Sequence, residues 1–358
     1  MTDGYYSVEY SSNPTTGIIL PSYYLSFNAA DTRRDVTCTS YSVCFLDTGS
    51  ASDTFVDVGT TYSAIMPGKF RLSWCTTPQA AAERNLNIPL IRYADVLLMY
   101  AETQNYLNSG PTAAGNAALM AVRNRANIGS LPIPSGQAAY QQMLVQERKW
   151  EFAGEFNLRT DLIRMNSLST EINNTRQAMK NLSAKTGAYA NVPVYRLYKF
   201  HKNSQAYGDP FLALPYIEIT NPAEIAVITN VPTAAANFAA YQTSLLPILA
   251  AHGITVGPED KWYPTQMFQA YTSTFNGNAR KAVGFKGGFN QIGTGNNMYS
   301  KPFGVAENGG TYPAWIEGNG DGLFFGFKEN KTELFPFAAQ SAGHPMVDNP
   351  NLTQLPGY

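Results

Sequence analysis

A helical stretch before the middle of the chain constrains the fold more than any other feature. Between Arg92 and Glu102 the sequence reads RYADVLLMYAE. The larger apolar side chains of this stretch are Tyr93, Val96, Leu97 and Tyr100. They recur at i, i+3, i+4 and i+7, a spacing that places them on one face of an α-helix. We expect this face to be buried, so that the helix packs into a helical core.

Breaker residues divide this part of the chain into three helices. Helical patterns run from Pro89 to Leu107, from about Thr112 to Ala126 and from about Gln137 to Ala153. Asn108–Pro111 ends the first pattern, and Gly129–Pro134 ends the second. Three consecutive helices joined by short turns predict a helix-turn-helix array, in which each helix buries one face against its neighbours.

The segments after the array have mixed patterns. Residues 166–190 and 226–251 are predicted to be partly helical, the second of them because it is rich in Ala and Leu. Val192–Phe200 and Phe211–Thr220 are predicted to be extended. The chain therefore returns from helices to strands after the array.

Two regions are predicted to be rich in loops. Residues 1–80 hold short alternating or aromatic runs broken by turn residues, which predicts loops with a few short strands. Residues 253–325 carry frequent Gly-Gly, Asn-Gly and Asp-Gly signals. Long irregular segments on a rigid scaffold often carry binding residues. The role of the whole insert at 226–325 stays open between ligand and partner contact.

Charge is scarce and nearly balanced. The chain has 25 Lys and Arg against 26 Asp and Glu, and 14% of its residues are charged, compared with about 25% in a typical soluble domain. Nucleic-acid and anionic-membrane partners are excluded because no net positive field is available. With 22 Tyr and 19 Phe, a neutral surface suits uncharged ligands such as sugars. The same composition also fits a Tyr-rich core with polar loops.

Metal and cofactor sites are not predicted. The three histidines are scattered, and the three cysteines, Cys38, Cys44 and Cys75, form no CxxC pattern. A Cys38–Cys44 disulfide and buried thiols both remain open. Glu317–Gly322 alternates oxygen-bearing residues with glycines, but it lacks the spacing of a calcium-binding loop and fits a Gly-rich turn better. No run of 18 apolar residues predicts a transmembrane helix.

Two acids in the third predicted helix allow two interpretations. Glu147 and Glu151 lie at i and i+4 beside Arg148, and paired carboxylates can act as acid and base in glycoside hydrolysis. Two acids on one helical face beside arginines also suit a structural ion-pair network between helices. We favour the network, and we expect changes at Arg92 and Glu102 to harm folding before binding.

Several motifs in a fixed order carry a resemblance to a known family. They are Arg92–Glu102, Arg123–Ala126, Glu147–Phe152 and Phe156–Arg164. In this order they resemble the carboxy-terminal half of SusD/RagB-family proteins, which are surface nutrient-binding lipoproteins of Bacteroidetes. Residues 334–358 resemble the family's carboxy terminus, and Asp31-Thr-Arg33 is a weaker match. The resemblance is strongest over residues 85–165.

The resemblance implies a mainly α-helical, SusD-like fold. Such a fold combines a tetratricopeptide-like helical array with a loop-rich region and a few short strands. It implies a loop-rich segment at 1–84, the array at 85–190 and a loop-rich carboxy-terminal region at 191–358. Family members usually begin with a lipoprotein signal and further helices, so the chain is expected to be the later part of such a protein.

The resemblance also implies a function. The expected role is capture of an oligo- or polysaccharide at the extracellular face of the outer membrane, and its delivery to a TonB-dependent SusC-like transporter. No catalytic residue is implied, and lipid anchoring would come from an amino-terminal part absent from this chain. Aromatic side chains are the expected ligand contacts. The candidates are Tyr23, Tyr24, Tyr41, Trp74, Trp262, Tyr263, Tyr312 and Trp315, while Trp150 is assigned to the core.

Three alternatives remain open at this point. Oligopeptide capture of the RagB kind would rely on backbone hydrogen bonds rather than aromatic stacking. A glycoside hydrolase would need two carboxyl groups about 5–10 Å apart across a cleft. A helical scaffold that binds only protein partners would have no small ligand.

Overall fold

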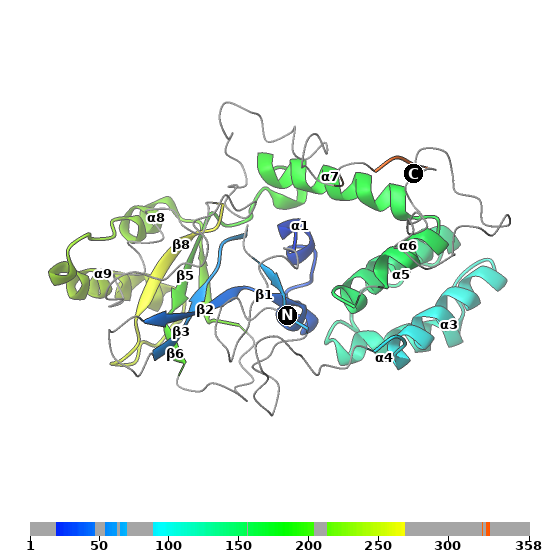
Figure 1. Ribbon diagram of the computed structural model, residues 1–358, viewed down its shortest axis with the longest axis horizontal. Coiled ribbons are helices and arrows are strands. Elements are labelled where there is room, and N and C mark those ends of the chain that lie inside the picture. The colour runs from blue at the N-terminus through cyan, green and yellow to red at the C-terminus, as the bar shows by residue number, and fades with distance from the viewer. Residues whose placement is uncertain are drawn as a thin grey trace, which may run out of the picture.

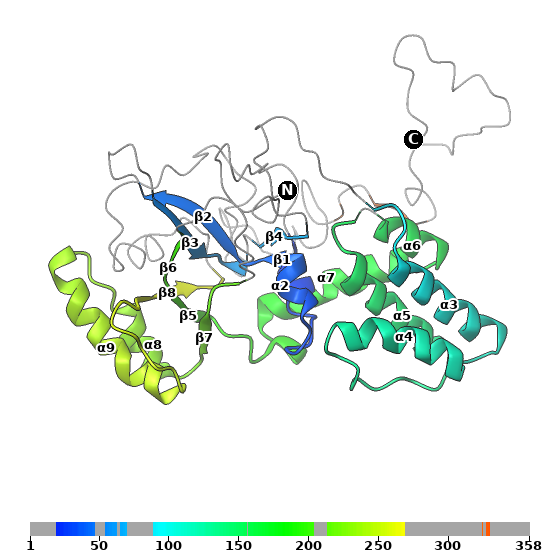
Figure 2. The same cartoon turned by 90° about the horizontal axis from the view of Figure 1, so that it is seen from below.

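A helical array forms one end of the molecule, and small β-sheets covered by two further helices form the other (Figures 1 and 2). The computed structural model describes residues 19–46, 54–62, 65–69, 89–155, 157–203, 213–268, 324 and 327–329. Within these residues helices predominate, which confirms the mainly helical fold predicted from the sequence.

The described residues contain nine α-helices and eight β-strands. The helices are α1 (Pro21–Tyr24), α2 (Arg33–Thr37), α3 (Tyr93–Leu107), α4 (Ala113–Arg125), α5 (Gln137–Phe152), α6 (Leu158–Arg164), α7 (Leu168–Ala184), α8 (Pro222–Thr229) and α9 (Phe238–Ala251). The strands are β1 (Cys38–Thr39), β2 (Tyr41–Leu46), β3 (Thr54–Gly59), β4 (Met66–Pro67), β5 (Tyr195–Lys199), β6 (His201–Asn203), β7 (Tyr216–Ile219) and β8 (Trp262–Gln266).

Helices α3, α4 and α5 confirm the three predicted helices of the array. Thr112 is the N-cap of helix α4, and its hydroxyl oxygen accepts a hydrogen bond from the backbone N–H of Gly115 at 3.0 Å. Gly115 also lets α4 approach α3 closely, because a Cβ atom there would lie 3.1 Å from the Cβ of Gln104. Buried side chains of all three helices, among them Leu98, Leu119 and Leu144, form one apolar cluster.

The predicted burial of the apolar face of α3 is wrong. Tyr93, Val96 and Tyr100 are 75%, 47% and 45% exposed, whereas Ala94 and Leu98 are buried. Periodicity identifies an apolar face, but it does not say on which side of the helix the neighbours lie. In α3 the acidic side chains face the array together with Leu97 and Leu98. Tyr93, Val96 and Tyr100 therefore face outward.

The segments after the array broadly follow their predictions. Helix α7 confirms the helix expected in 166–190, and β5 and β7 confirm two extended runs. The segment 226–251 holds the end of α8 and all of α9, with a break between them. Residues 1–80, predicted as loops with a few short strands, also contain the short helix α1, which we did not predict. Pro21 stands in its first turn, where a missing N–H costs nothing.

Three small antiparallel sheets bring distant segments together. Strand β5 lies between β7 and β8, and β3 lies between β2 and β6, while β1 pairs with β4. Helices α8 and α9 pack on the β5 sheet through an apolar cluster that includes Leu197, Ile219 and Leu245. Because β3 and β6 are far apart in the sequence, their sheet joins segments that we had assigned to separate regions. That division of the chain stays a prediction.

A buried ion-pair network joins the helices of the array. The carboxylate of Glu147 is fully buried and accepts hydrogen bonds from Arg33 and Arg123, each at 2.8 Å. Arg33 also binds Asp31 at 2.7 Å and Glu151 at 3.0 Å. These contacts confirm the structural interpretation of Glu147 and Glu151, and they place Asp31-Thr-Arg33 at the centre of the network.

A second set of ion pairs extends the network to α3 and α6. Arg148 is buried between Asp95 of α3 and Asp161 of α6, with Asp161 at 2.6 Å. Arg164 bridges α6 to Glu102 of α3 at 2.9 Å. Arg92, just before α3, binds Glu151 at 2.8 Å. Both charged side chains of α3 therefore have partners inside the array.

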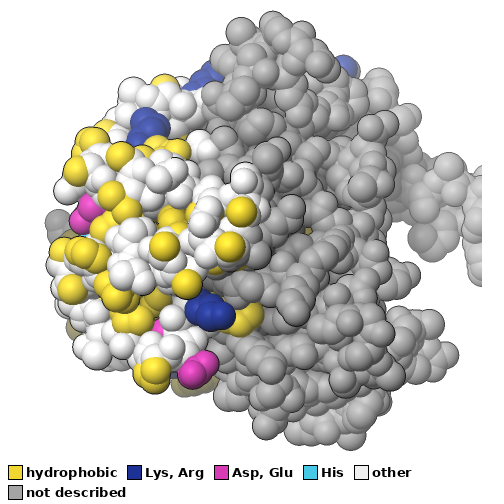
Figure 3. Space-filling view, turned by 90° about the vertical axis from the view of Figure 1, so that its left-hand side faces the viewer, with side chains coloured by type: hydrophobic (Ala, Val, Ile, Leu, Met, Phe, Trp, Pro, Cys, Tyr) yellow, Lys and Arg dark blue, Asp and Glu magenta, His cyan; other side chains and the backbone are white. Residues whose placement is uncertain are grey.

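The surface at the end of the molecule that carries α8 and α9 is poor in charge. There, isolated charged side chains lie among hydrophobic and neutral polar ones (Figure 3).

Cys38 is a buried thiol. Among the described helices, none is long and apolar enough to cross a membrane.

Replacing Arg148 by Ala should lower the free energy of unfolding by about 3–5 kcal/mol. The carboxylate of Asp95 then loses its cation, and that of Asp161 keeps only Arg164. Urea denaturation of wild type and variant measures the difference. Arg125→Ala is the matched control: Arg125 also pairs with Glu151, but its side chain is 57% exposed, so the expected loss is below about 1 kcal/mol. Equal losses in the two variants would contradict this account.

Stability should fall in acid through Glu151. Burial alone would raise the pKa of this carboxyl, but hydrogen bonds and charge from Arg125 and Arg92 outweigh it and lower the pKa below its ordinary value of 4.5. The folded state thus favours the charged form, and its contribution is present above about pH 4.5 and lost as the pH falls through the lowered pKa. The stability gap between wild type and Glu151→Gln, from urea denaturation, should therefore shrink below pH 4.5.

Glu259→Gln, at an exposed loop position, is the control for this pH series. Its unfolding curves should follow those of the wild type at every pH. A gap for Glu151→Gln that widens in acid would contradict the assigned direction of the pKa shift.

Candidate functional site

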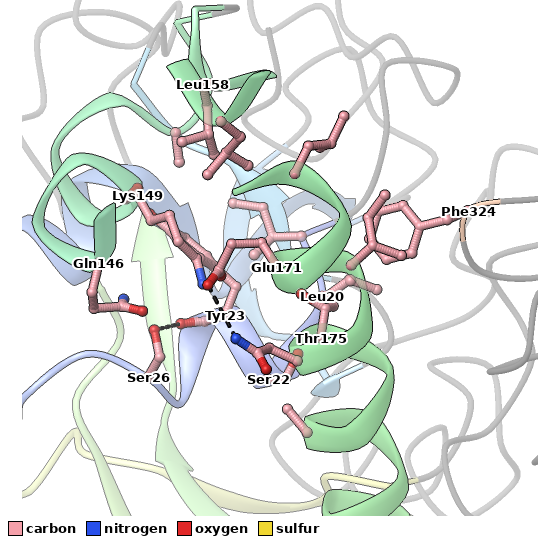
Figure 4. Close-up of a pocket in the computed structure, with 18 of the residues that line it drawn as sticks. Leu20, Ser22, Tyr23, Ser26, Gln146, Lys149, Leu158, Glu171, Thr175 and Phe324 are labelled. Atoms are coloured by element: carbon pink, nitrogen blue, oxygen red, sulfur yellow. Dashed lines mark hydrogen bonds and ion pairs between the residues drawn. The ribbon is translucent and has the colours of Figure 1, made fainter. Parts of the chain in front are cut away.

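A cavity of about 510 Å³ lies where α1, α5, α6 and α7 meet (Figure 4). Its volume is within the range of about 300–1,000 Å³ typical of small-molecule sites. The short helix α1 forms one wall, and α5 and α7 form two others, with Phe324 at the edge. The lining residues come from segments that are far apart in the sequence.

A compact polar group lies on one wall of the cavity. The ammonium group of Lys149 in α5 is 2.6 Å from the carboxylate of Glu171 in α7. The amide nitrogen of Asn174 donates to the other oxygen of Glu171 at 3.1 Å. The Lys149 and Glu171 side chains are 20% and 17% exposed. Each of the two side chains therefore orients the other, and the pair carries no net charge. Both side chains are still accessible to a ligand.

Lys149 has this position because of the helical phase of α5. Two residues along a helix correspond to a rotation of about 200°, so Lys149 points away from Glu147 and its network. The sequence motif from Glu147 to Phe152 thus serves two sides of one helix. One side is buried among arginines, and the other lines the cavity.

Hydrogen bonds fix α1 against α5 beside the polar group. The hydroxyl of Tyr23 donates to the carbonyl of Lys149 at 2.9 Å. The hydroxyl of Ser26 donates to the carbonyl of Tyr23 at 2.7 Å and accepts from the indole N–H of Trp150 at 3.0 Å. Burial raises the pKa of Tyr23 well above 10, so its hydroxyl stays protonated. Trp150 belongs to the core, as predicted.

The opposite side of the cavity is apolar. Leu162, Leu168 and Ile172 are buried in one cluster, and Leu158 packs against it. Figure 4 shows Leu158 and Phe324 away from Gln146 and Ser26. The side-chain nitrogen of Gln146 is buried and finds no hydrogen-bond acceptor among the described residues. The cavity thus combines an apolar wall with a polar wall that has a donor to offer.

The aromatic residues predicted to contact a ligand fall into three groups in the structure. Tyr23 lines the cavity. Tyr24, Tyr41, Trp262 and Tyr263 are only 1%, 3%, 2% and 0% exposed. Trp74, Tyr312 and Trp315 lie outside the described residues. Among the predicted aromatic residues that the structure describes, Tyr23 alone is placed to meet a ligand in the cavity.

The buried aromatic residues stabilise the core behind the site. Arg196 of β5 donates to the hydroxyl of Tyr24 at 3.2 Å, and its guanidinium lies 5.5 Å from the Tyr24 ring. The hydroxyl of Tyr263 accepts from the backbone N–H of Gly59 at 2.7 Å, and its ring stacks on Tyr198 at 6.0 Å. Their ring faces are therefore occupied by protein.

Glu171 is the only acid among the described residues that line the cavity. A glycoside hydrolase of the usual type needs a second carboxyl group across the site, and no described lining residue supplies one. Within the described part of the chain, no group of three or more His, Cys, Asp or Glu side chains is arranged to hold a metal ion.

Sequence reasoning missed the polar residues of the cavity. Glu171, Asn174 and Thr175 recur at i, i+3 and i+4 on α7, the spacing of one helical face. This polar face could have indicated a binding site, but the polar face of a helix usually contacts only solvent. The contact between Glu171 of α7 and Lys149 of α5 depends on tertiary packing.

Comparisons with known proteins give two findings. A family model described as the SusD family matches residues 1–249 of this chain. Among solved structures, the chain is similar to a SusD homologue from Bacteroides thetaiotaomicron VPI-5482, with 26% identity over 43% of this chain and 33% of that one, and a TM-score of 0.33. The match thus spans about a third of that protein's length. Comparison with curated proteins gave no match.

Replacing Glu171 by Gln should leave the fold intact. Because the Lys149–Glu171 pair is partly exposed, its loss should lower the free energy of unfolding by less than about 1 kcal/mol. Urea denaturation of the variant beside the wild type measures this. A loss as large as that expected for Arg148→Ala would make the pair a structural contact rather than part of a site.

Proposed function

The chain belongs to the SusD family, whose members bind nutrients at the cell surface, and we propose that it captures an oligo- or polysaccharide in the cavity between α1, α5 and α7. Its mainly helical, SusD-like fold provides the scaffold. The captured glycan would then pass to a TonB-dependent SusC-like transporter.

The polar group beside an apolar wall is the observation that carries this proposal. Sugar hydroxyls can donate to the carboxylate of Glu171 and accept from Lys149 or from the amide of Gln146. The C–H faces of a sugar ring can pack on Tyr23 and the leucines opposite. Because Lys149 and Glu171 neutralise each other at 2.6 Å, the cavity favours an uncharged ligand.

The proposed action is binding without bond cleavage. Hydrolysis would require two carboxyl groups about 5–10 Å apart across the ligand, whereas the described lining residues include one acid, Glu171. A few charge-assisted hydrogen bonds and one or two stacking contacts would give affinities of about micromolar to millimolar. Weak binding suits a protein that must release its ligand to a transporter.

We propose that the protein lies at the extracellular face of the outer membrane and is anchored there by lipid. Family membership supports this location and the transporter partner. Trp74, Tyr312 and Trp315 remain proposed glycan contacts outside the described residues. They would extend the site beyond the cavity.

Calorimetric titration with a panel of soluble polysaccharides and oligosaccharides tests the proposal. Wild type should bind at least one glycan with saturation. Glu171→Gln and Asn174→Ala should weaken that binding about tenfold or more, because hydrogen bonds to charged groups are the strongest contacts on offer. Glu224→Gln is the matched control, since Glu224 pairs with His252 and does not line the cavity. Its affinity for the glycan should equal that of the wild type.

Other outcomes separate the alternatives. Binding of oligopeptides instead of glycans would favour a RagB-like peptide carrier. Release of reducing ends from a bound glycan would contradict binding without cleavage. Glycan binding that is equally strong in all three variants would place the site elsewhere in the chain.

A further inference from the structure

Two helices give the cavity a wall made only of aliphatic side chains. Leu158 and Leu162 lie one turn apart on α6. Leu168 and Ile172 lie one turn apart on α7. The i, i+4 spacing places each pair on one face of its helix, and the two faces pack together at the cavity. We call these four residues the aliphatic wall; none of their side chains can donate or accept a hydrogen bond.

The polar wall of the cavity has donors that lack acceptors. The ammonium group of Lys149 has three hydrogens, and the hydrogen bonds among the described residues use one of them, to Glu171 at 2.6 Å. The side-chain nitrogen of Gln146 is buried and has no acceptor among the described residues. Lys149 and Gln146 lie three positions apart on α5 and both line the cavity (Figure 4). A ligand that brings a strong acceptor to this wall would satisfy a buried donor that is costly to leave unpaired.

An unsubstituted sugar ring suits the aliphatic wall only in part. Hydroxyl groups surround the rim of the ring, so only its two C–H faces are apolar. A rim hydroxyl held against the aliphatic wall loses its hydrogen bonds to water and finds no replacement there. A sugar with an apolar substituent would fit this side of the cavity better than a bare one.

An acyl substituent supplies both features that the two walls require. Its carbonyl oxygen is an acceptor with two lone pairs, which suits Lys149 and Gln146. Its alkyl end is apolar and carries no hydroxyl group, which suits the aliphatic wall. A methyl ether would provide the alkyl end without the carbonyl. An ester or amide is also uncharged, in keeping with the neutral Lys149–Glu171 pair.

The cavity is large enough for such a unit. Its volume of about 510 Å³ equals the share of about 17 molecules of liquid water at about 30 Å³ each. A sugar unit together with a small acyl group therefore has room between the two walls.

We infer that the cavity is a subsite for an acylated sugar unit, whose carbonyl accepts from Lys149 and Gln146 and whose alkyl end packs on the aliphatic wall. The inference rests on the proposed function and narrows its ligand class to glycans that carry small acyl groups. Esters on sugar oxygens and amides on sugar nitrogens present the same carbonyl and alkyl end. The two sources are therefore distinguished by experiment.

Calorimetric titration with matched pairs of glycans tests the inference. Acetylated xylo-oligosaccharides and acetylated gluco-manno-oligosaccharides are each compared with the same material after removal of the esters by mild alkali. Chitotetraose, which carries N-acetyl groups, is compared with cellotetraose, which does not. In at least one pair the acetylated member should bind about tenfold more tightly or better, because it adds a buried methyl group and a hydrogen bond. A preference in the first two pairs indicates esters, and one in the last pair indicates amides.

Two variants locate the acyl group within the cavity. Leu158→Gln puts a polar group into the aliphatic wall and should abolish the preference for the acetylated member. Gln146→Leu removes the unpaired donor and should reduce that preference about fivefold; because it also removes a buried unsatisfied group, the fold should not suffer. Leu246→Gln is the matched control, since Leu246 is 43% exposed on α9 and does not line the cavity. Its preference should equal that of the wild type, and circular dichroism should show all three variants folded.

The remaining outcomes separate this inference from the proposed function. Equal affinity for both members of every pair that binds would overturn the acyl subsite and leave glycan capture standing. A preference that survives in both Leu158→Gln and Gln146→Leu would also overturn it, because the acyl group would then lie elsewhere. Absence of binding to every glycan, acetylated or not, would overturn the proposed function and the acyl subsite together.

Discussion

Burial of the Glu147 carboxylate between two arginines is the contact on which the helical array depends. A buried charge without a partner would cost several kcal/mol, so Arg33 and Arg123 must reach Glu147 whenever α5 is packed. Arg33 comes from α2, more than a hundred residues away in the sequence. This carboxylate therefore helps to tie the early segment of the chain to the array, together with the contacts of Arg33 to Glu151 and of Tyr23 to the Lys149 carbonyl. The same requirement, repeated at Arg148 with Asp95 and Asp161, sets how α3 and α6 dock on α5.

The cavity follows from that arrangement. The ion pairs of Glu147 and Arg148 fix the rotation of α5 about its own axis. The side chain of Lys149 therefore points to a different side of the helix. Helix α7 crosses there and presents Glu171, while Tyr23 of α1 binds the Lys149 carbonyl. The cavity residues thus make few direct contacts with the ion-pair network. The geometry of the cavity nevertheless depends on that network. Variants of the cavity can change binding without unfolding the array, whereas variants of the network would be expected to lose both.

Local patterns predicted part of this structure. Periodicity and breaker residues were sufficient for α3, α4, α5 and α7, because these helices are long and bounded by turn residues. The same periodicity could not tell which side of α3 faces the array; that was decided by the partners of Asp95 and Glu102 on other helices. Aromatic residues were poor indicators of the site, since Tyr24 and Tyr263 carry the same sequence signal as Tyr23 but are enclosed by the core. The polar wall could not be predicted because Lys149 and Glu171 meet only through tertiary packing.

The close pairing of Lys149 and Glu171 gives the cavity a dipole rather than a net charge. The field of a dipole falls off faster with distance than that of a single charge, and salt at physiological strength screens charges beyond about 8 Å. The cavity would therefore recognise its ligand through direct contacts only, without long-range electrostatic attraction. A binding site of this kind would work equally in dilute and in salty surroundings, which suits a protein exposed to a changing medium.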